Sequence, residues 1–168
     1  MNTAAEVIAH LNLKPHPAEG GYYIETYRSN GTIPANALGR SYSGERAYGT
    51  AIYYLLTPET FSAIHRLPGD EIFHFYMGDP VEMLHLEPDG TGRKVILGTD
   101  LQRKMRPQIV VRGRVWQGSR LLPGGRFALL GTTMAPGFDF ADYVPGRRAE
   151  LIAQYPKFED AIVALTHA

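Results

Sequence analysis

Short β-rich runs, separated by glycine and proline, occupy the chain from Gly20 to about Asp142 and constrain its fold more than any other feature. They cover residues 22–27, 51–56, 61–67, 71–77, 81–87, 94–97, 109–111 and 126–134. Eight short strands with turn residues between them are typical of a β-sandwich or a closed β-barrel. The sequence therefore predicts a mainly β fold.

Helical patterns flank this β region. The stretch Thr3-Ala4-Ala5-Glu6 is a capping-box pattern, and apolar residues follow it at helical spacing. Near the other end, apolar residues fit one or two helices interrupted at Pro156. We expect one domain over residues 1–168, with a short N-terminal helix, a barrel over about 20–142 and a helical tail over 147–166 packed outside the sheet.

Charge and cysteine content exclude several classes of protein. The 17 lysines and arginines balance 17 aspartates and glutamates, so no net field attracts nucleic acid or an anionic membrane. The chain has no cysteine, which excludes thiol catalysis, zinc-thiolate sites and disulfides. No stretch approaches the ~20 apolar residues of a membrane-spanning helix, and the N-terminus has no basic start. We expect a cytoplasmic protein that binds a small molecule, with neither nucleic acid nor membrane as a partner.

The segment His65-Arg66-Leu67-Pro68-Gly69-Asp70-Glu71 has the spacing of a site built on two strands and a turn. In a strand, alternate side chains share a face, so His65 and position 67 point the same way. A turn at Pro68-Gly69 then brings Glu71 back beside them. Such nitrogen and oxygen groups inside a barrel suit Fe, Mn, Ni, Zn or Cu. His65 and Glu71 also suit an acid-base dyad or a buried hydrogen-bonded pair.

This segment resembles the first motif of the cupin superfamily, roughly G-x5-H-x-H-x3or4-E-x6-G. His65, Glu71 and Gly78 match it at the right intervals. Glu59 stands where the motif has its first glycine, and Leu67 where it has its second histidine.

The second cupin motif, roughly P-x-G-x2-H-x3-N, aligns with residues 111–116. Gly113 matches, Val111 replaces the proline, and Trp116 stands where the last histidine is expected. The resemblance thus leaves two of the four usual metal ligands, His65 and Glu71. We expect no cofactor and keep these two residues only as weak candidates for a divalent metal such as Fe, Mn, Zn, Ni or Cu.

Four separated segments are similar to one cupin subfamily, the cupin-5 group or domain of unknown function 985. They are Glu19-Gly20-Gly21-Tyr22-Tyr23, Phe61 to Gly78, Pro107 to Trp116, and Ala135 to Phe140. The resemblance implies a double-stranded β-helix, the cupin jelly-roll barrel, with a pocket inside it and usually a homodimer. The implied barrel is also similar to that of the sugar-nucleotide 3,5-epimerases, which use a histidine base without metal.

The expected site residues lie on the strands around this motif. His65 and Glu71 are the candidate catalytic pair, and His74 is expected on the outer face. Trp116 is expected to fill part of the metal space with a stacking surface, and His85 to face inward in one of its two possible registers. Glu19-Gly20-Gly21 is interpreted as a turn. The candidate ligand-binding residues are Tyr23, Tyr53, Phe73, Phe75, His85, Trp116 and Gln117.

Three functions fit these residues. In the first, an isomerase or epimerase of a carbohydrate-like molecule uses His65 as general base and Glu71 to orient it, with a pocket tyrosine assisting. In the second, the pocket is a non-catalytic binding module for a sugar, nucleotide or aromatic metabolite. In the third, a metal-dependent cupin enzyme recruits ligands such as His85 or Gln117. We favour them in that order.

Overall fold

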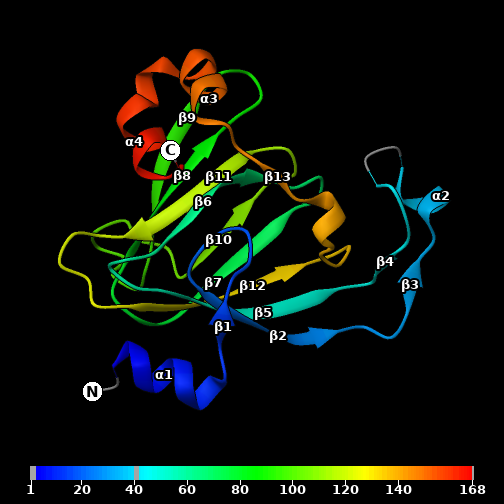
Figure 1. The fold of residues 1–168 in the computed structure, drawn as a ribbon, viewed down its shortest axis with the longest axis horizontal. Coiled ribbons are helices and arrows are strands. Elements are labelled where there is room, and N and C mark those ends of the chain that lie inside the picture. The colour runs from blue at the N-terminus through cyan, green and yellow to red at the C-terminus, as the bar shows by residue number, and fades with distance from the viewer. Residues whose placement is uncertain (1–2, 40–41, 168) are drawn as a thin grey trace.

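The computed structural model describes residues 3–39 and 42–167 and confirms the mainly β cupin jelly roll (Figure 1). Among these residues, the first sheet runs in the order β1 (Lys14–Pro15), β2 (Tyr22–Arg28), β5 (Thr50–Leu56), β12 (Ala128–Met134), β7 (Glu71–Gly78) and β10 (Gln108–Val111). The second sheet runs β13 (Val144–Pro145), β6 (Phe61–Arg66), β11 (Trp116–Leu121), β8 (Val81–Leu86) and β9 (Gly92–Leu97). Neighbouring strands pair antiparallel.

The inward side chains of the two sheets form the main core. Alternate residues of each strand are apolar and meet between the sheets, as strand geometry requires. The cluster includes Tyr54, Phe73, Met83, Leu121 and Leu130, all buried. This packing fills much of the barrel, so a cavity can form only where the inward residues become polar.

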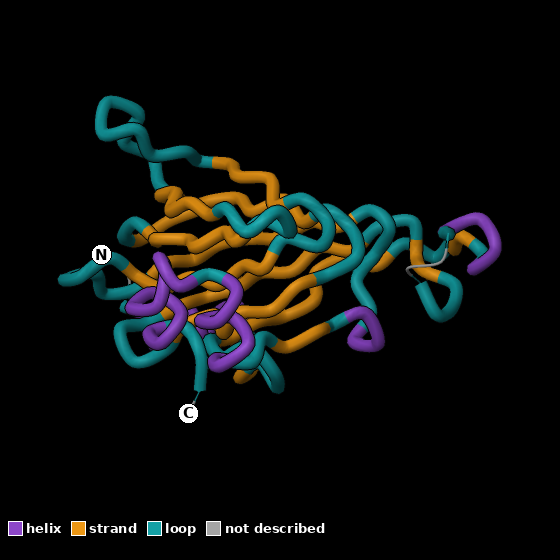
Figure 2. The backbone as a smooth tube through the Cα atoms, turned by 90° about the horizontal axis from the view of Figure 1, so that it is seen from above, coloured by secondary structure: helices purple, strands orange, loops and turns teal. Residues whose placement is uncertain are grey.

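Helices cover the outer faces of the barrel. Helix α1 (Ala4–Leu11) begins at a capping box between Thr3 and Glu6 and packs Val7 against Leu55 of β5. Helices α3 (Arg148–Gln154) and α4 (Glu159–Ala164), joined by the 3-10 turn η2 (Pro156–Phe158), cover the second sheet. Figure 2 shows these helices gathered beside the strands. The expected N-terminal helix and C-terminal helical tail are confirmed.

The segment 29–48 contains short elements that project from the barrel (Figures 1 and 2). They are β3 (Thr32–Ile33), α2 (Ala35–Leu38) and β4 (Arg46–Ala47), and β3 pairs with β4. A buried ion pair fixes the end of this segment. Arg46 Nε and Nη2 donate to the two carboxylate oxygens of Asp142, in the 3-10 turn η1 (Phe140–Asp142), at 2.7 and 2.6 Å.

Strand β11 is absent from the runs predicted by sequence, yet it lies between β6 and β8 in the second sheet. Its sequence, Trp-Gln-Gly-Ser-Arg-Leu, has no β-branched residue and contains a glycine, so it carries little strand signal. Gly118 is required by tight packing, because a Cβ there would lie 2.8 Å from Ile64 Cγ1. Tertiary contacts rather than propensity make this segment a strand.

None of the helices in the part of the chain that the structure describes is long and apolar enough to cross a membrane.

Candidate functional site

A cavity of about 480 Å³ lies against β2, β5, β7 and β12 and is bounded by the segment 138–140. Its volume is in the range of small-molecule pockets. Tyr23 and Glu71 are the expected site residues that line it. Its other chemistry-bearing lining residues are Lys14, His16, Glu19, Glu25, Arg28, Asp139, Phe138 and Phe140.

Glu19 is held at the pocket by a backbone arrangement that only glycine permits at the next position. Gly20 has a φ of +96°, and a Cβ there would lie 2.5 Å from the carbonyl oxygen of Phe61. This close approach lets the Ala63 N–H donate to the Glu19 carbonyl at 2.8 Å. The Tyr54 hydroxyl donates to the Gly20 carbonyl at 2.8 Å. The sequence Glu19-Gly20-Gly21 therefore holds the backbone of Glu19 against β6, and this places the Glu19 carboxyl group at the pocket.

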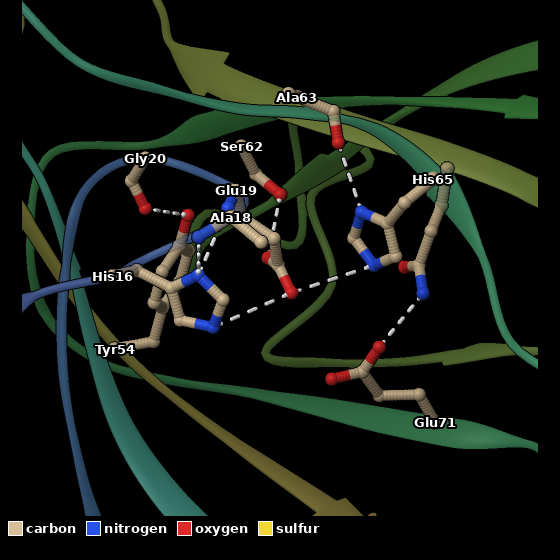
Figure 3. Close-up of polar contacts among 10 residues, drawn as sticks. His16, Ala18, Glu19, Gly20, Tyr54, Ser62, Ala63, His65 and Glu71 are labelled. Atoms are coloured by element: carbon tan, nitrogen blue, oxygen red, sulfur yellow. Dashed lines mark hydrogen bonds and ion pairs between the residues drawn. The ribbon is translucent and has the colours of Figure 1, made fainter. Parts of the chain in front are cut away.

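The Glu19 carboxyl lies between two imidazole rings (Figure 3). Its Oε1 is 3.8 Å from Nε2 of His16 and 3.7 Å from Nε2 of His65, while Ser62 Oγ donates to Oε2 at 3.0 Å. Burial raises the pKa of Glu19, and the nearby His16 and the Ser62 hydrogen bond oppose this rise. Glu19 therefore holds a proton at higher pH than an exposed glutamate.

The two histidines are held in opposite tautomers. Nδ1 of His16 accepts from the backbone N–H of Glu19 at 2.9 Å, so a neutral His16 carries its proton on Nε2. Nδ1 of His65 lies 2.8 Å from the Ala63 carbonyl and must donate to it, which leaves Nε2 of a neutral His65 as an acceptor. Burial lowers the pKa of both rings, opposed by Glu19 at His16 and by Glu71 at His65. Both rings are thus biased toward the neutral form.

Glu71 enters the same site from β7. Gln117 Nε2 donates to its Oε2 at 2.7 Å, and the residue is buried although it lines the pocket. Burial raises the pKa of Glu71 to about 6, the negative charge of Glu19 adds to the rise, and His65 opposes it. Because this pKa lies close to neutral, Glu71 can both take up and release a proton under ordinary conditions.

His65 lies behind the carboxyl groups rather than on the pocket surface. It is 1% exposed, and the ring of Tyr143 stacks on it with 4.9 Å between ring centres. Burial raises the pKa of Tyr143 as well. His65 thus reaches the pocket through the glutamates beside it.

Strand alternation separates the other expected residues. Phe73 is buried in the main core and Phe75 packs against it. Tyr53 faces outward against Tyr76, with 5.8 Å between ring centres. These three residues line the core or the outer face, so the expectation that they form pocket wall is not met in this cavity. His74 also lies on the outer face, with its Nε2 3.1 Å from Thr133 Oγ1.

The expectation that Trp116 lies inside the barrel, where it would fill part of the space of a metal ion, is wrong. Trp116 packs on the outer face with the C-terminal helices, and Arg66 lies 4.5 Å from the centre of its ring. Gln117 faces inward instead and pairs in register with His65 and His85. Gln117 rather than Trp116 holds the inward position, because successive residues of a strand face opposite sides of the sheet. His85 therefore also faces inward and is 1% exposed.

The structure adds residues that the sequence did not identify as functional. His16 and Glu19 come from the segment before β2, and Phe138 and Phe140 from the loop after β12. The paired glycines after Glu19 were the available signal, but alone they indicate only a turn. Nothing local in the sequence shows that these segments meet.

The sequence matches the family described as Cupin superfamily (DUF985) over residues 5–144. An uncharacterized protein of Saccharomyces cerevisiae, YML079W, is 34% identical over 133 residues, which cover 74% of this chain and 66% of the yeast protein. This chain therefore spans about two thirds of that relative's length.

Solved structures agree with this match. A hypothetical protein from Leishmania major superposes with a TM-score of 0.88 at 31% identity, covering 99% of this chain and 100% of the other. Protein SO0799 from Shewanella oneidensis gives a TM-score of 0.88 at 31% identity, with 99% of each chain covered. Oxalate decarboxylase from Bacillus subtilis gives 0.54 at 10% identity, covering 92% of this chain and 38% of the other, which is a likeness of fold alone.

Proposed function

The chain belongs to the DUF985 family of the cupin superfamily, and we propose that it is an isomerase or epimerase of a carbohydrate-like small molecule, acting by proton transfer. The observation that supports this is the meeting of two pocket carboxyl groups, part-buried Glu19 and buried Glu71, both with raised pKa values, beside buried His65, whose pKa is lowered. Titratable groups with perturbed pKa values that meet in a pocket are typical of acid-base catalysis.

The geometry divides the roles in this proposal. Glu71, ionised above about pH 6, takes a proton from the carbon next to a carbonyl group of the ligand. Glu19, whose pKa burial raises, donates a proton to the ligand, and the Ser62 hydrogen bond holds its carboxyl in place. The step leaves Glu71 protonated and Glu19 ionised, so the cycle closes when the proton on Glu71 returns to Glu19; Nε2 of His65, 3.7 Å from Glu19 Oε1, accepts this proton and passes it on to Glu19. His65 is then the base of the centre but transfers protons through Glu19 rather than touching the ligand.

The mouth of the pocket supports a ring-shaped polar ligand. Phe138 and Phe140 contact each other edge to face at 5.0 Å, and Tyr23 packs on His16 at 4.5 Å. These rings offer flat surfaces, and Lys14 adds positive charge at the edge, where Arg28 is ion-paired with Glu25. Such a combination suits a sugar ring with its hydroxyl groups or an acidic substituent.

The donor set does not fit the four-ligand metal centre of the cupin motif. Leu67 has no donor atom, and Gln117 directs its amide nitrogen at Glu71. Among the described residues, no three histidine, cysteine or acidic side chains are grouped to hold a metal ion. The oxalate decarboxylase neighbour has Mn(II) centres, but the proposed reaction takes no step through a metal.

A deuterium-exchange experiment tests the proposal. Sugars, sugar phosphates, nucleotide sugars and small acids are first screened by thermal shift, and each hit is incubated with the protein in D2O and followed by proton NMR. The proposal expects the proton next to the carbonyl to be replaced by deuterium. Hits that bind but return unchanged, without deuterium, would instead establish the binding-module alternative.

Variants locate any exchange in the site. Glu71→Gln and His65→Gln should each lower the exchange rate by roughly a hundredfold to ten-thousandfold. The matched controls are Glu82→Gln and His74→Gln, whose side chains lie outside the cavity. Full exchange in His65→Gln would exclude His65 from the reaction.

The proposal for assembly is a homodimer formed by the outer face of the first sheet near its β10 edge. Tyr76 is 50% exposed there and Val110 37% exposed. An edge strand with apolar neighbours is usually covered by a partner. Light scattering should give twice the mass of one chain for the natural protein and the mass of one chain for Tyr76→Glu. If the two proteins have the same mass, this interface is rejected.

A further inference from the structure

Buried polar atoms gather on the inner face of the second sheet. Among the residues the structure describes, His65 Nε2, both ring nitrogens of His85, Gln117 Oε1 and Ser119 Oγ have no hydrogen-bond partner. Each of these four residues is no more than 3% exposed. Unpartnered buried polar atoms are costly and rare, so a group of them in one place requires an explanation.

The four residues form one continuous row. Gln117 on β11 pairs in register with His65 on β6 and with His85 on β8. Ser119 lies two residues along β11, on the same face, opposite Met83. Directly opposite residues in an antiparallel pair have Cβ atoms about 4.5–5.5 Å apart, so Gln117 is a direct neighbour of both histidines, and Ser119 is a diagonal neighbour of His85.

Gln117 connects this row to the pocket. Its Nε2 donates to Oε2 of Glu71 at 2.7 Å, while its Oε1 is buried without a hydrogen-bond partner. His85 is neutral near pH 7, because burial lowers its pKa to about 4 and the charge of Arg93 on β9 adds to this. A neutral imidazole carries one N–H, and Gln117 Oε1 is the acceptor beside it. Because they do not bond directly, a bridging water is the ordinary solution.

We propose that His85 is a positioning residue for Glu71: it holds the Gln117 amide, through a buried water that Ser119 also contacts, with the amide nitrogen toward the carboxyl. This row is a site for a small neutral molecule that both donates and accepts hydrogen bonds, namely water. The role of this positioning in catalysis rests on the proposed function. The contact itself does not depend on any substrate.

The orientation of the amide decides the charge state of Glu71. With its nitrogen toward Glu71, the amide favours the carboxylate; with its oxygen there, it favours the carboxylic acid. The other groups that act on Glu71 are Glu19, His65 and the hydroxyl of Thr132. Removing the support from His85 lets the amide reverse, so Glu71 should hold its proton to higher pH.

Carbon NMR of protein labelled at the glutamate carboxyl carbon tests this, with the Glu71 signal assigned from its loss in Glu71→Gln. In His85→Leu the midpoint of the Glu71 pH titration should rise by roughly half a pH unit or more. In His85→Gln, which keeps an N–H donor, it should stay near the natural value. His74→Leu, on the outer face, is the matched control and should not move it. A folded His85→Leu with an unchanged midpoint overturns the proposal.

Ser119→Ala provides an independent variant if His85→Leu does not fold. It removes one contact of the buried water and should raise the Glu71 midpoint in the same direction by a smaller amount. An unchanged midpoint in Ser119→Ala would equally overturn the proposal. A shifted midpoint in a protein that exchanges no ligand proton would support the positioning role while rejecting the proposed reaction.

Discussion

Oε1 of Glu19 lies 3.7 Å from Nε2 of His65, and the hydrogen bonds of the two residues determine which of these atoms can accept a proton from the other. His65 Nδ1 is committed to the Ala63 carbonyl, so Nε2 is the acceptor of the neutral ring. Burial raises the pKa of Glu19 and lowers that of His65. These opposite shifts bring the proton affinities of the carboxyl and the imidazole closer together than in exposed side chains, which favours proton transfer between them.

Glu19→Gln keeps the shape and the Ser62 contact but removes the transferable proton. We expect deuterium exchange of the ligand to fall by roughly a hundredfold to ten-thousandfold while ligand binding persists. Proton NMR in D2O and thermal-shift titration measure the two quantities. Exposed Glu59→Gln is the control. Exchange at the natural rate in Glu19→Gln would remove Glu19 from the mechanism.

Glu71→Gln should change how stability depends on pH. A carboxyl with a higher pKa in the folded protein binds its proton more tightly there, so its contribution is present below the unfolded value of 4.5 and is lost as the pH rises through about 6. This shift corresponds to ~2 kcal/mol. The variant should therefore gain up to about that much over the natural protein between acid and neutral pH. Urea denaturation across this range measures it, and a pH-independent difference would contradict the raised pKa.

Gly20→Ala should destabilise the protein and disturb the site. Its φ of +96° is unfavourable for alanine, and the new Cβ would lie 2.5 Å from the Phe61 carbonyl oxygen. Gly90→Ala is the control, because Gly90 has a φ of +89° but nothing within 4 Å of the new Cβ. We expect a loss of roughly 1–2 kcal/mol for Gly90→Ala and clearly more for Gly20→Ala. Equal losses by thermal denaturation would show that Phe61 does not constrain Glu19.

Arg46→Met should leave Asp142 buried without its partner. Breaking such a pair costs about 3–5 kcal/mol, whereas replacing both members, as in Arg46→Met with Asp142→Leu, recovers much of it. The control is Arg112→Met, whose exposed pair with Asp70 contributes about 0–1 kcal/mol. Denaturant titration compares the three. A small loss in Arg46→Met would mean that this pair does not hold the loop beside the pocket.

Local sequence signals predicted the elements that depend on neighbouring residues. The glycine and proline punctuation predicted most strands, and the capping box predicted α1. His65 and Glu71 are brought together by one turn, so their meeting was also predictable. Strand β11 was not, because its residues become a strand through packing on both faces. With β11 unassigned, its register was open, and Trp116 was placed on the wrong face.

The sequence by itself determined a mainly β barrel with a histidine and a glutamate facing inward, since periodicity and turns are encoded within a few residues. Only the tertiary structure decided which groups join them. Glu19 and His16 reach the pocket through the approach of Gly20 to β6, Phe138 and Phe140 through the loop after β12, and Gln117 through its register with His65. These contacts join residues distant in sequence, and long-range pairing is set by the free energy of the whole fold rather than by any local pattern.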